Sequence, residues 1–346
     1  MKTTAAILVA QHQPLVIGEV EIPSPGFGQA LVEVKVSRIC GSQLGEIDGV
    51  KGADPYLPHL LGHEGGGIVL ETGPEVRHVK RGDRVVLHWR PGRGIESRPP
   101  SCHWNGKTLN AGLVTTFNRH AVVSENRLTV VPDDTDFEVC ALLADTLITG
   151  FGVISNDAKV RIGESVVVIG CGGIGLGVVL GAKLAGAHPI IAVDMHPHKL
   201  KKAAEHGATH CVHSGKTDFQ QEVLRLLGNR QPDVVIDGTG NIHVLEQAFA
   251  LAAEKHGRCI GFGVMPHDHR MHINTLPLHF GKILKGSHGG DSKPAEDIPR
   301  YLAMMRDGKF DARGFVSHRF KLDEINDAIA RMRDGEVIHA MIHFEP

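Results

Sequence analysis

The stretch Val166-Val167-Val168-Ile169-Gly170-Cys171-Gly172-Gly173-Ile174-Gly175 decides the fold class of this 346-residue chain. Four consecutive apolar residues predict a buried strand, and the glycines after them predict a tight turn into a helix. A G-x-G-x-x-G turn between a strand and a helix is typical of a dinucleotide-binding unit. The first glycine permits the turn, the second lets the backbone approach a pyrophosphate, and the third lets the helix pack on the strand.

An acid follows the glycine turn at the place where such units bind a ribose. The next apolar run, residues 189–194 (PIIAVD), ends in Asp194, about 20 residues beyond the turn. A carboxylate there accepts hydrogen bonds from the ribose diol and repels a 2′-phosphate, so these features together predict NAD as the cofactor and not NADP. The alternative is a glycine turn in a structural α/β unit that binds no dinucleotide.

Strands and helices alternate through the rest of this region. Apolar runs separated by segments with helical patterns occur at residues 165–170, 189–194, 210–213, 233–237 and 258–263. This order predicts an α/β fold with a doubly wound parallel sheet, covered by helices on both faces. We therefore expect residues 148–289 to form a Rossmann domain that binds the dinucleotide.

The first third of the chain has a different pattern. Short alternating or apolar runs bounded by glycine and proline occur at residues 30–36, 67–71, 82–87 and 120–123. These runs predict an irregular, partly barrel-like β domain. The last 50 or so residues show helical patterns and then a closing strand, at residues 294–307, 322–333 and 340–344.

Composition narrows the class of protein. The chain has a formal net charge of −2, 42% hydrophobic and 22% charged residues, which is typical of a globular protein and gives no field that attracts nucleic acid or an anionic membrane. Residues 1–10 carry no secretory signal pattern, and the apolar stretches are interrupted well before a membrane-spanning length. The scattered cysteines form no CxxC pair, which is typical of buried thiols in a reducing compartment. We expect a cytoplasmic protein that binds neither nucleic acid nor a membrane.

Three residues far apart in the sequence are candidate zinc ligands. Cys40 follows the first β segment, His63 follows a proline-rich loop, and Asp145 precedes the dinucleotide unit. Thiolate, imidazole and carboxylate all bind zinc, and three protein ligands leave one position open for a substrate oxygen. Zinc with an open position is a Lewis acid that eases the formation of an alkoxide. Taken singly, however, a buried cysteine or a loop histidine is more often a residue without a metal.

Several motifs together resemble the zinc-containing medium-chain dehydrogenase/reductase family, and the resemblance runs over nearly the whole chain. The motifs are the glycine turn and the stretches Ile39–Ser42 (ICGS), Leu61–Gly65 (LGHEG), Gly82–Val85 (GDRV) and Thr149–Gly152 (TGFG). The resemblance implies a GroES-like catalytic domain made of residues 1–147 and 290–346, with the Rossmann domain between them. It also implies a catalytic zinc held by Cys40, His63 and Asp145, although many relatives have cysteine where this chain has Asp145.

The resemblance implies roles for further residues. Glu64 is similar to an acid that acts beside the zinc or as a transient ligand of it. Ser42 is similar to the hydroxyl that passes the substrate proton toward solvent. Trp89 and Phe117 match aromatic walls of the substrate pocket, and Lys199 matches a lysine that contacts the adenosine ribose.

Two positions depart from the pattern of the family. Gly45 stands where relatives often place the histidine that ends the proton relay, so we expect the relay to end on ribose and water, or on His59 or Asp48. His339 stands where relatives often place an arginine that contacts the cofactor pyrophosphate. Because histidine supplies less positive charge at neutral pH, we expect NAD binding to be weaker or pH-dependent.

Many relatives carry a lobe in which four closely spaced cysteines bind a second, structural zinc. The corresponding stretch, residues 89–113, contains only Cys102. Because a closed zinc site needs four ligands, we predict one catalytic zinc per chain and no structural zinc. The arginine-rich stretch Arg90–Arg98 replaces the lobe. It is either a solvated loop or subunit contact, or an anion-binding rim for an acidic or phosphorylated substrate.

The resemblance implies reversible hydride transfer between NAD and a small alcohol or carbonyl compound. The arginine-rich stretch and the missing lobe favour a polyol, sugar or cyclitol-like alcohol over a simple aliphatic one. Relatives extend the cofactor sheet across a two-fold axis through the region after residue 258, which implies a homodimer or homotetramer. The alternatives are a non-catalytic NAD-binding relative and a zinc-free quinone or enoyl reductase of the same superfamily.

Overall fold

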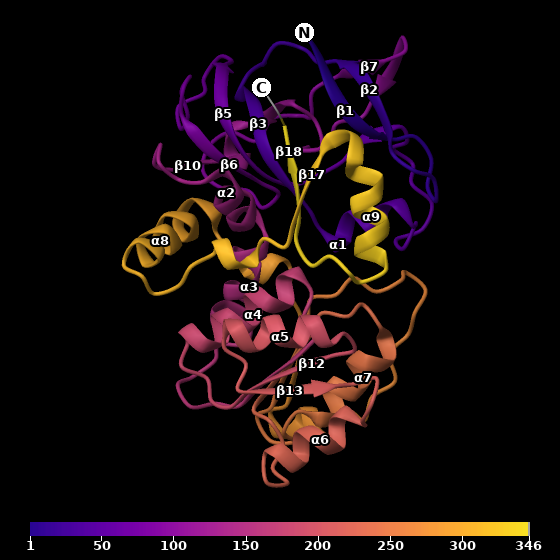
Figure 1. The fold of residues 1–346 in the computed structure, drawn as a ribbon, viewed down its shortest axis with the longest axis vertical. Coiled ribbons are helices and arrows are strands. Elements are labelled where there is room, and N and C mark those ends of the chain that lie inside the picture. The colour runs from indigo at the N-terminus through magenta and orange to yellow at the C-terminus, as the bar shows by residue number, and fades with distance from the viewer. Residues whose placement is uncertain (345–346) are drawn as a thin grey trace. The chain divides into compact units, whose positions relative to one another are not determined.

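The computed structural model describes residues 1–344, and the chain divides into two compact units. The first unit combines Met1–Asp145 with the segment that begins at Lys293, and the second unit is Thr146–Ser292. In Figure 1 the yellow strand β18 (Ala340–His343) lies beside the purple strand β3 (Gln29–Ile39), with which it pairs. The first unit is therefore assembled from both ends of the chain.

Two sheets make up most of the first unit. A five-stranded sheet has the order β4-β1-β2-β7-β8, with the bounds His59–Leu60, Lys2–Leu8, Val16–Glu21, Cys102–Trp104 and Lys107–Leu109. A seven-stranded sheet has the order β10-β6-β5-β3-β18-β17, and β9 also pairs with β3. The strands of this second sheet not yet given have the bounds Leu128–Val130 (β10), Arg84–His88 (β6), Glu64–Thr72 (β5), His318–Lys321 (β17) and His120–Ser124 (β9).

The core of the first unit joins its two chain segments. The helices of this unit are α1 (Gly41–Ile47), α2 (Phe137–Ala144), α8 (Pro294–Arg306) and α9 (Ile325–Arg333). Buried side chains from the N-terminal part pack in one apolar cluster with buried side chains of α9 and β18, including Leu8, Ile39, Phe117, Ile329 and Ile342. Removal of this apolar surface from water is the main stabilising contribution, so the C-terminal segment is part of the first unit and not an appendage.

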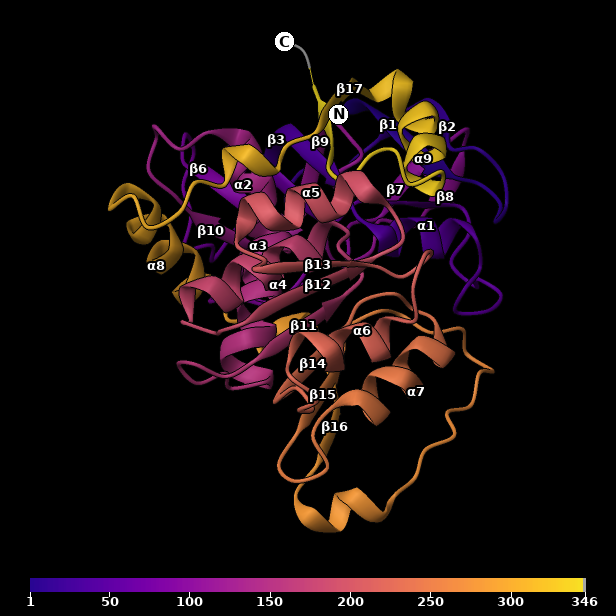
Figure 2. The ribbon, with the colours of Figure 1, turned by 60° about the horizontal axis from the view of Figure 1, so that its bottom comes forward.

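The second unit is a parallel sheet with the order β13-β12-β11-β14-β15-β16. These strands are His210–His213, Ile190–Asp194, Val166–Ile169, Val234–Asp237, Arg258–Gly261 and Ile283–Gly286. The helices are α3 (Thr146–Gly152), α4 (Gly173–Leu184), α5 (Pro197–His206), α6 (Phe219–Leu226) and α7 (Ile242–Leu251). In Figure 2 α5 and α6 lie on opposite sides of the sheet, and every residue of β11, β12 and β14 is buried. Strands covered on both faces are uniformly apolar, so the predicted doubly wound α/β fold is confirmed.

Several strands were not expected from the sequence. β1 and β2 pair with each other at the N-terminus, β17 pairs with β18, and β16 lies at the end of the parallel sheet. β2 and β16 leave most of their residues exposed, so neither carries the apolar pattern on which strand prediction depends. Their strand conformation comes from pairing with neighbours.

Among residues 1–344, no single helix is both long and apolar enough to cross a membrane. One bent pair of helical segments, Phe137–Ala144 with Thr146–Asp157, is long and apolar enough for a membrane span only when the two segments are counted together.

Candidate metal and cofactor sites

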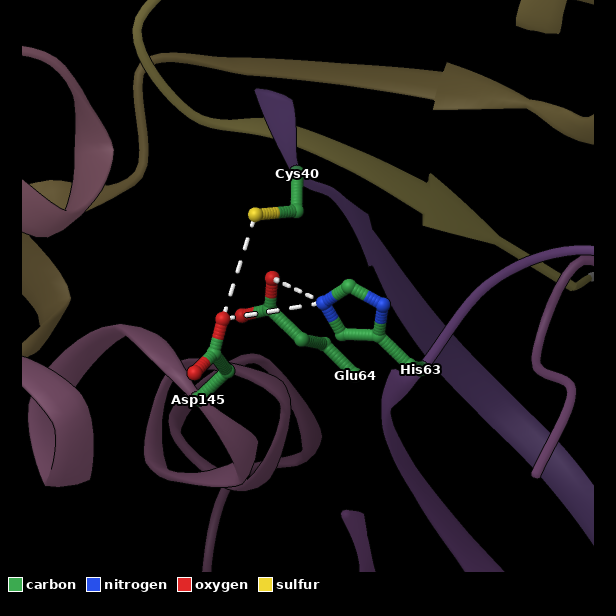
Figure 3. Close-up of side chains that lie close together, drawn as sticks. All are labelled: Cys40, His63, Glu64 and Asp145. Carbon is green, nitrogen blue, oxygen red and sulfur yellow. Dashed lines mark hydrogen bonds and ion pairs between the residues drawn. The ribbon is translucent and has the colours of Figure 1, made fainter. Parts of the chain in front are cut away.

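Four side chains that could bind a metal ion converge in the first unit (Figure 3). The group consists of Cys40, His63, Glu64 and Asp145, and their ligand atoms all lie within 4.8 Å of one another. Cys40 follows β3 and is the N-cap of α1, His63 precedes β5, Glu64 begins β5, and Asp145 caps the C-terminus of α2. The tertiary structure thus brings together all four residues that the sequence analysis named as metal ligands.

The spacing of these atoms suits zinc. The Asp145 Oδ2 atom lies 3.8 Å from the Cys40 Sγ atom and 3.6 Å from the His63 Nε2 atom, and that nitrogen lies 3.7 Å from a Glu64 oxygen. Tetrahedral ligands at zinc–ligand distances of about 2.0–2.3 Å are separated from one another by roughly 3.3–3.8 Å. The donor set of one sulfur, one imidazole nitrogen and carboxylate oxygens also matches the preference of this ion.

The approach of α2 to β5 positions Asp145. Gly66 of β5 lies under this helix, and a Cβ atom at Gly66 would come within 2.6 Å of the Cys140 side chain and 2.8 Å of the Phe137 carbonyl oxygen. A larger residue at this position would push the helix away from the strand. Because Asp145 follows the last residue of α2, the same displacement would move its carboxylate away from Cys40 and His63.

The side chain of Gln43 connects two of the candidate ligands. Its Oε1 atom accepts a hydrogen bond of 2.8 Å from the backbone N–H of Cys40, and its Nε2 atom contacts Nδ1 of His63. Gln43 is 1% exposed, so its contacts are shielded from water. Gln43 was not expected at the site from the sequence, although a glutamine three residues after a helix N-cap is the pattern of a capping box.

A buried arginine neutralises Glu64. Nη1 of Arg38 forms an ion pair with Oε1 of Glu64, and Nε of Arg38 donates a 3.0 Å hydrogen bond to Nδ1 of His339. Arg38 is 2% exposed, and Glu64 and His339 are 0% exposed. Burial disfavours the charged guanidinium, but Glu64, Cys40 and Asp145 together outweigh burial and raise the pKa of Arg38, which therefore stays charged. Arg38 was missed as well, although a charged residue inside the mostly buried strand β3 requires a partner.

The electrostatics of the cluster favour a cation. Burial lowers the pKa of His63, but its hydrogen bonds to Asp145 and Cys40 outweigh burial and raise this pKa well above its ordinary value. A site that stabilises positive charge on an imidazole also stabilises a metal ion at the same place.

The glycine turn in the second unit has the geometry of a phosphate cradle. Gly170 follows β11 with φ of +90°, a conformation that glycine adopts without strain, and Gly172 is the N-cap of α4. A Cβ atom at Gly175 would lie 1.9 Å from the Gly170 carbonyl oxygen, whereas a Cβ atom at Gly172 would meet nothing within 4 Å. Gly173, Ile174 and Gly175 form the first turn of α4, where helix N–H groups lack intrahelical acceptors.

Asp194 also stabilises the turn. It ends β12, and its two carboxylate oxygens each accept a 2.8 Å hydrogen bond, one from the backbone N–H of Cys171 and one from that of His196. Each carboxylate oxygen has two lone pairs, so acceptor capacity for ribose hydroxyls remains. Lys199 lies in the first turn of α5, which follows β12, and its role at the adenosine ribose stays a prediction.

Comparisons with known proteins now decide the family. A family model described as "Alcohol dehydrogenase GroES-like domain" matches residues 26–133, and one described as "Zinc-binding dehydrogenase" matches residues 173–307. "Alcohol dehydrogenase 6" of Peromyscus maniculatus is 32% identical over 369 residues, which cover 99% of this chain and 98% of that protein. S-(hydroxymethyl)glutathione dehydrogenase of Paracoccus denitrificans is 31% identical over 382 residues, which cover 99% of this chain and 100% of that protein.

The chain belongs to the zinc-containing medium-chain alcohol dehydrogenase family. The crystal structure of benzyl alcohol dehydrogenase from Acinetobacter calcoaceticus agrees, with a TM-score of 0.90 and 25% sequence identity over 100% of both chains. The family predicted from the motifs is therefore confirmed, as are the GroES-like and Rossmann architectures. The protein is an oxidoreductase of the alcohol dehydrogenase type.

Ser42 and Trp89 of this dehydrogenase lie near the metal cluster. Ser42 is in the first turn of α1, two residues after Cys40, and its Oγ atom is buried without a hydrogen-bond partner in the part of the chain that the structure describes. Trp89 follows β6, and its indole N–H donates a 3.0 Å hydrogen bond to the Oδ1 atom of Asp145. Its contact with a candidate metal ligand was not expected from the sequence.

The structure corrects the prediction for Phe117. This side chain is 0% exposed and belongs to the apolar cluster that contains Leu8, Leu61 and Ile325. It also packs under Gly62, where a Cβ atom would come within 2.7 Å of its ring. An aromatic side chain surrounded on all sides by apolar neighbours is a core residue, so Phe117 supports the turn before His63 and is not a wall of the substrate pocket.

Two candidate ends of the proton relay have other partners. Nε2 of His59 lies 2.7 Å from the Asp54 carboxylate, and the Asp48 carboxylate lies 2.5 Å from the Arg333 guanidinium. Gly45 lies within α1 and offers no side chain. These contacts favour ribose and water over His59 and Asp48 as the end of the relay.

The arginine-rich stretch is held by a buried carboxylate. Glu125 is 1% exposed and accepts hydrogen bonds from the backbone N–H groups of Ile95, Arg77 and His78 at 2.8–3.0 Å. The stretch leads to Cys102 in β7, which is also buried, and burial raises the pKa of this thiol to about 11. The stretch is therefore a loop fixed by specific hydrogen bonds, and Cys102 is a neutral core thiol.

Proposed function

We propose that this protein transfers a hydride reversibly between a polar alcohol and NAD at a single zinc site held by Cys40, His63 and Asp145. The convergence of one sulfur, one imidazole and two carboxylates within 4.8 Å is the observation that carries this proposal. When bound, zinc polarises the alcohol oxygen as a Lewis acid, and NAD accepts the hydride. The intact donor set argues against a zinc-free reductase and against a non-catalytic relative.

Each residue of the cluster has a distinct task in this proposal. Cys40, His63 and Asp145 hold the ion and leave one position for the substrate oxygen. Glu64 stays beside the ion, because Arg38 engages one of its oxygens, and it can act as a transient ligand. The Ser42 hydroxyl accepts the proton of the alcohol and passes it toward solvent, which agrees with its unsatisfied buried oxygen.

The charges of the site support a divalent ion. A Cys40 thiolate with the carboxylates of Glu64 and Asp145 supplies three negative charges. The Arg38 guanidinium and Zn²⁺ supply three positive charges, so the loaded site is neutral overall. Buried charges are tolerated when they are compensated in this way, and removal of the ion leaves an excess of negative charge.

The second unit supplies the NAD site in this proposal. The first turn of α4 binds the pyrophosphate through backbone N–H groups, Asp194 binds the ribose diol, and Lys199 lies near the adenosine ribose. Substitution of Asp194 by serine removes the charge that repels a 2′-phosphate. We expect Asp194→Ser to weaken NAD binding and to narrow the preference for NAD over NADP, measured by fluorescence titration with NADH and NADPH.

A polyol, sugar or cyclitol-like alcohol is the substrate class that we propose. The relatives named above include one that acts on S-(hydroxymethyl)glutathione and one that acts on benzyl alcohol, so the family spans polar and aromatic substrates. The exposed arginines Arg93 and Arg98 add hydrogen-bond donors that suit a polar or anionic compound. A panel containing sorbitol, myo-inositol, benzyl alcohol and S-(hydroxymethyl)glutathione separates these classes by kcat/KM.

We further propose a homodimer or homotetramer in the cytoplasm. β16 is the end strand of the parallel sheet, and its first residue, Ile283, is 47% exposed. In the segment just before this strand, Leu276 and Phe280 are 59% and 52% exposed. Exposed apolar side chains at an unpaired strand edge favour pairing with a second copy. The scattered unpaired cysteines agree with a reducing compartment. Light scattering measures the oligomeric state, and a monomer at micromolar concentration would contradict this part.

The central experiment measures zinc content and activity together. Purified protein is expected to contain one zinc per chain and to reduce NAD with an alcohol of the panel, whereas Cys40→Ala loses both zinc and activity. The matched control is Cys102→Ala, because Cys102 is a buried thiol distant from the cluster in the sequence and is not expected to bind metal. Protein without zinc, together with full activity in Cys40→Ala, would reject the proposal.

A further inference from the structure

We propose that Trp89 is a positioning residue for the metal site, whose indole N–H holds Asp145 as a one-oxygen ligand. The inference rests on the proposed zinc site. Nε1 of Trp89 donates to Oδ1 of Asp145 across 3.0 Å, and Asp145 is 4% exposed. An indole N–H can only donate, and the rigid ring fixes its direction.

The two oxygens of Asp145 face different partners. Oδ2 lies 3.8 Å from the Cys40 sulfur and 3.6 Å from Nε2 of His63, which places it within the candidate ligand set. Oδ1 is engaged by Trp89 instead. A carboxylate can bind a metal through one oxygen or two, so a donor on Oδ1 reserves Oδ2 for the ion and leaves coordination space for a substrate oxygen.

The donor on Oδ1 is electrically neutral, and this matters for the chemistry. A guanidinium or ammonium group at the same place would compete with the metal for the charge of Asp145. The indole orients the carboxylate while leaving its negative charge to the ion. Arg38, by contrast, forms its direct ion pair with Glu64, the acid that we assign to a position beside the ion, and acts on Asp145 only through space.

Trp89 is itself fixed by Arg127, which pairs with the arginine-rich loop, and by Arg90 of that loop. Its backbone carbonyl accepts a hydrogen bond from Nη1 of Arg127, which is 3% exposed, and Nη2 of Arg127 pairs with Glu96. The guanidinium of Arg90 lies 5.7 Å from the centre of the Trp89 ring. The loop between Arg90 and Arg98 therefore supports the residue that orients a metal ligand, a function that the sequence left open.

Trp89 and Asp145 are expected to depend on each other. A cysteine at position 145 would have one ligand atom and no second acceptor for the indole N–H. If Trp89 acts through Oδ1, removal of its N–H matters only when residue 145 is a carboxylate. If Trp89 only fills space, its substitution has the same effect with either ligand.

The test compares Trp89→Phe in two backgrounds, the natural chain and Asp145→Cys. Phenylalanine keeps an aromatic ring and removes the N–H. We expect Trp89→Phe to weaken zinc binding by about 10–100-fold in the natural chain, measured by competition with a chelator, and by less than about 2-fold in Asp145→Cys. The matched control is Trp104→Phe, at the only other tryptophan, which lies in β7 and is expected to leave zinc affinity unchanged.

A cobalt-substituted protein gives a second readout that does not depend on activity. Without the N–H, nothing supplied by residue 89 holds Oδ1 away from the ion, and the visible absorption of Co²⁺ falls as its coordination number rises. A weaker visible absorption of Co²⁺ in Trp89→Phe supports the inference. If Asp145→Cys does not fold, this spectrum is the measurement that tests the inference. An unchanged spectrum, or an equal loss of zinc affinity in both backgrounds, overturns the inference. Natural protein that binds no zinc at all would instead reject the proposed function.

Discussion

Nε of Arg38 donates a 3.0 Å hydrogen bond to Nδ1 of His339, joining two side chains that are 301 positions apart in the chain. The pairing of β3 with β18 makes this contact possible, since it brings the C-terminal segment back to the strand that carries Arg38. Arg38 therefore supplies the positive charge that lies beside both Glu64 and His339. The contribution of His339 to NAD binding, expected from the sequence, stays a prediction.

Removal of the Arg38 guanidinium is expected to destabilise the first unit. Arg38→Met leaves the fully buried carboxylate of Glu64 without its ion-pair partner, which costs about 3–5 kcal/mol of the free energy of unfolding. Urea titration followed by tryptophan fluorescence measures this, because both tryptophans lie in the first unit. Adding Glu64→Gln is expected to recover part of the loss, and full additivity of the two substitutions would contradict a direct pair.

His339→Arg tests whether NAD binds more weakly because position 339 carries a histidine and not an arginine for the cofactor pyrophosphate. An arginine cannot accept the hydrogen bond from Arg38, and a second buried guanidinium beside the first is repelled. We expect His339→Arg alone to lower the melting temperature. The double variant Arg38→Met with His339→Arg relocates one positive charge, and we expect it to bind NAD more tightly than Arg38→Met does. Isothermal titration measures the affinity, and no tightening in the double variant counts against a cofactor role for position 339.

The Gln43 amide is expected to limit the zinc affinity. Nε2 of His63 faces the other candidate ligands, so metal binding requires the proton on Nδ1 and an acceptor beside it. Gln43 has one oxygen, which already accepts the N–H of Cys40. Gln43→Glu has one oxygen for the Cys40 backbone N–H and one for the proton on Nδ1 of His63. We therefore expect the zinc dissociation constant of this variant to fall. Gln43→Met offers an oxygen to neither group, so we expect its zinc affinity to stay well below that of Gln43→Glu. Equal affinities in the three proteins would show that Gln43 does not orient His63.

Loss of the Ser42 hydroxyl is expected to slow proton transfer without loss of the metal. Ser42→Ala should lower kcat by about 10²–10⁴-fold, the usual contribution of a positioned proton-transfer group. Ser42→Thr keeps a hydroxyl and should retain much more activity. Zinc content, measured on the same samples, should be unchanged because Ser42 is not in the ligand cluster. A loss of zinc in Ser42→Ala would assign the residue to site structure instead of proton transfer.

Asp237 is expected to make the second unit less stable as pH rises. Asp237 is 0% exposed at the end of β14, and burial raises the pKa of its carboxyl to about 6, while Thr239 opposes the shift. The folded chain holds this proton more tightly than the unfolded chain, so stability is greatest below about pH 4 and falls until about pH 6. The pKa difference corresponds to roughly 3 kcal/mol.

Asp237→Asn removes this titration while keeping an oxygen for Thr239, which donates to Oδ1 through its backbone N–H and its hydroxyl. Relative to the natural chain, the variant should gain up to roughly 3 kcal/mol of unfolding free energy between pH 4 and pH 8. Differential scanning calorimetry across this range measures the difference. A stability difference that does not change with pH would mean that the carboxyl is already ionised in the folded chain at pH 4.

Local patterns were sufficient for the cofactor unit. Residues 166–175 specify a buried strand, a turn that requires glycine and a helix, all within ten neighbouring residues. The structure has β11, the turn and α4 in that order. β16 escaped prediction because three of its four residues are exposed, so its conformation depends on pairing with β15.

The metal cluster could be named from motifs, but the contacts around it could not. Cys40, His63 and Asp145 were identifiable because their neighbours in the sequence carry family patterns. Trp89 and Phe117 both fit an aromatic pocket wall by sequence position. Only packing separates them, since Phe117 is enclosed by apolar neighbours and Trp89 donates to a ligand.

The sequence by itself determined the family, the α/β dinucleotide fold and the residues able to bind zinc, because each is encoded in short segments whose residues interact locally. The tertiary structure alone decided which groups surround those ligands. Arg38 with Glu64 and His339, and Trp89 with Asp145, are pairs formed by strands and helices distant in sequence. A hydrogen bond forms only when the donor–acceptor distance is correct to within a few tenths of an ångström. The packing of such distant elements sets this distance, and the order of residues along the chain does not.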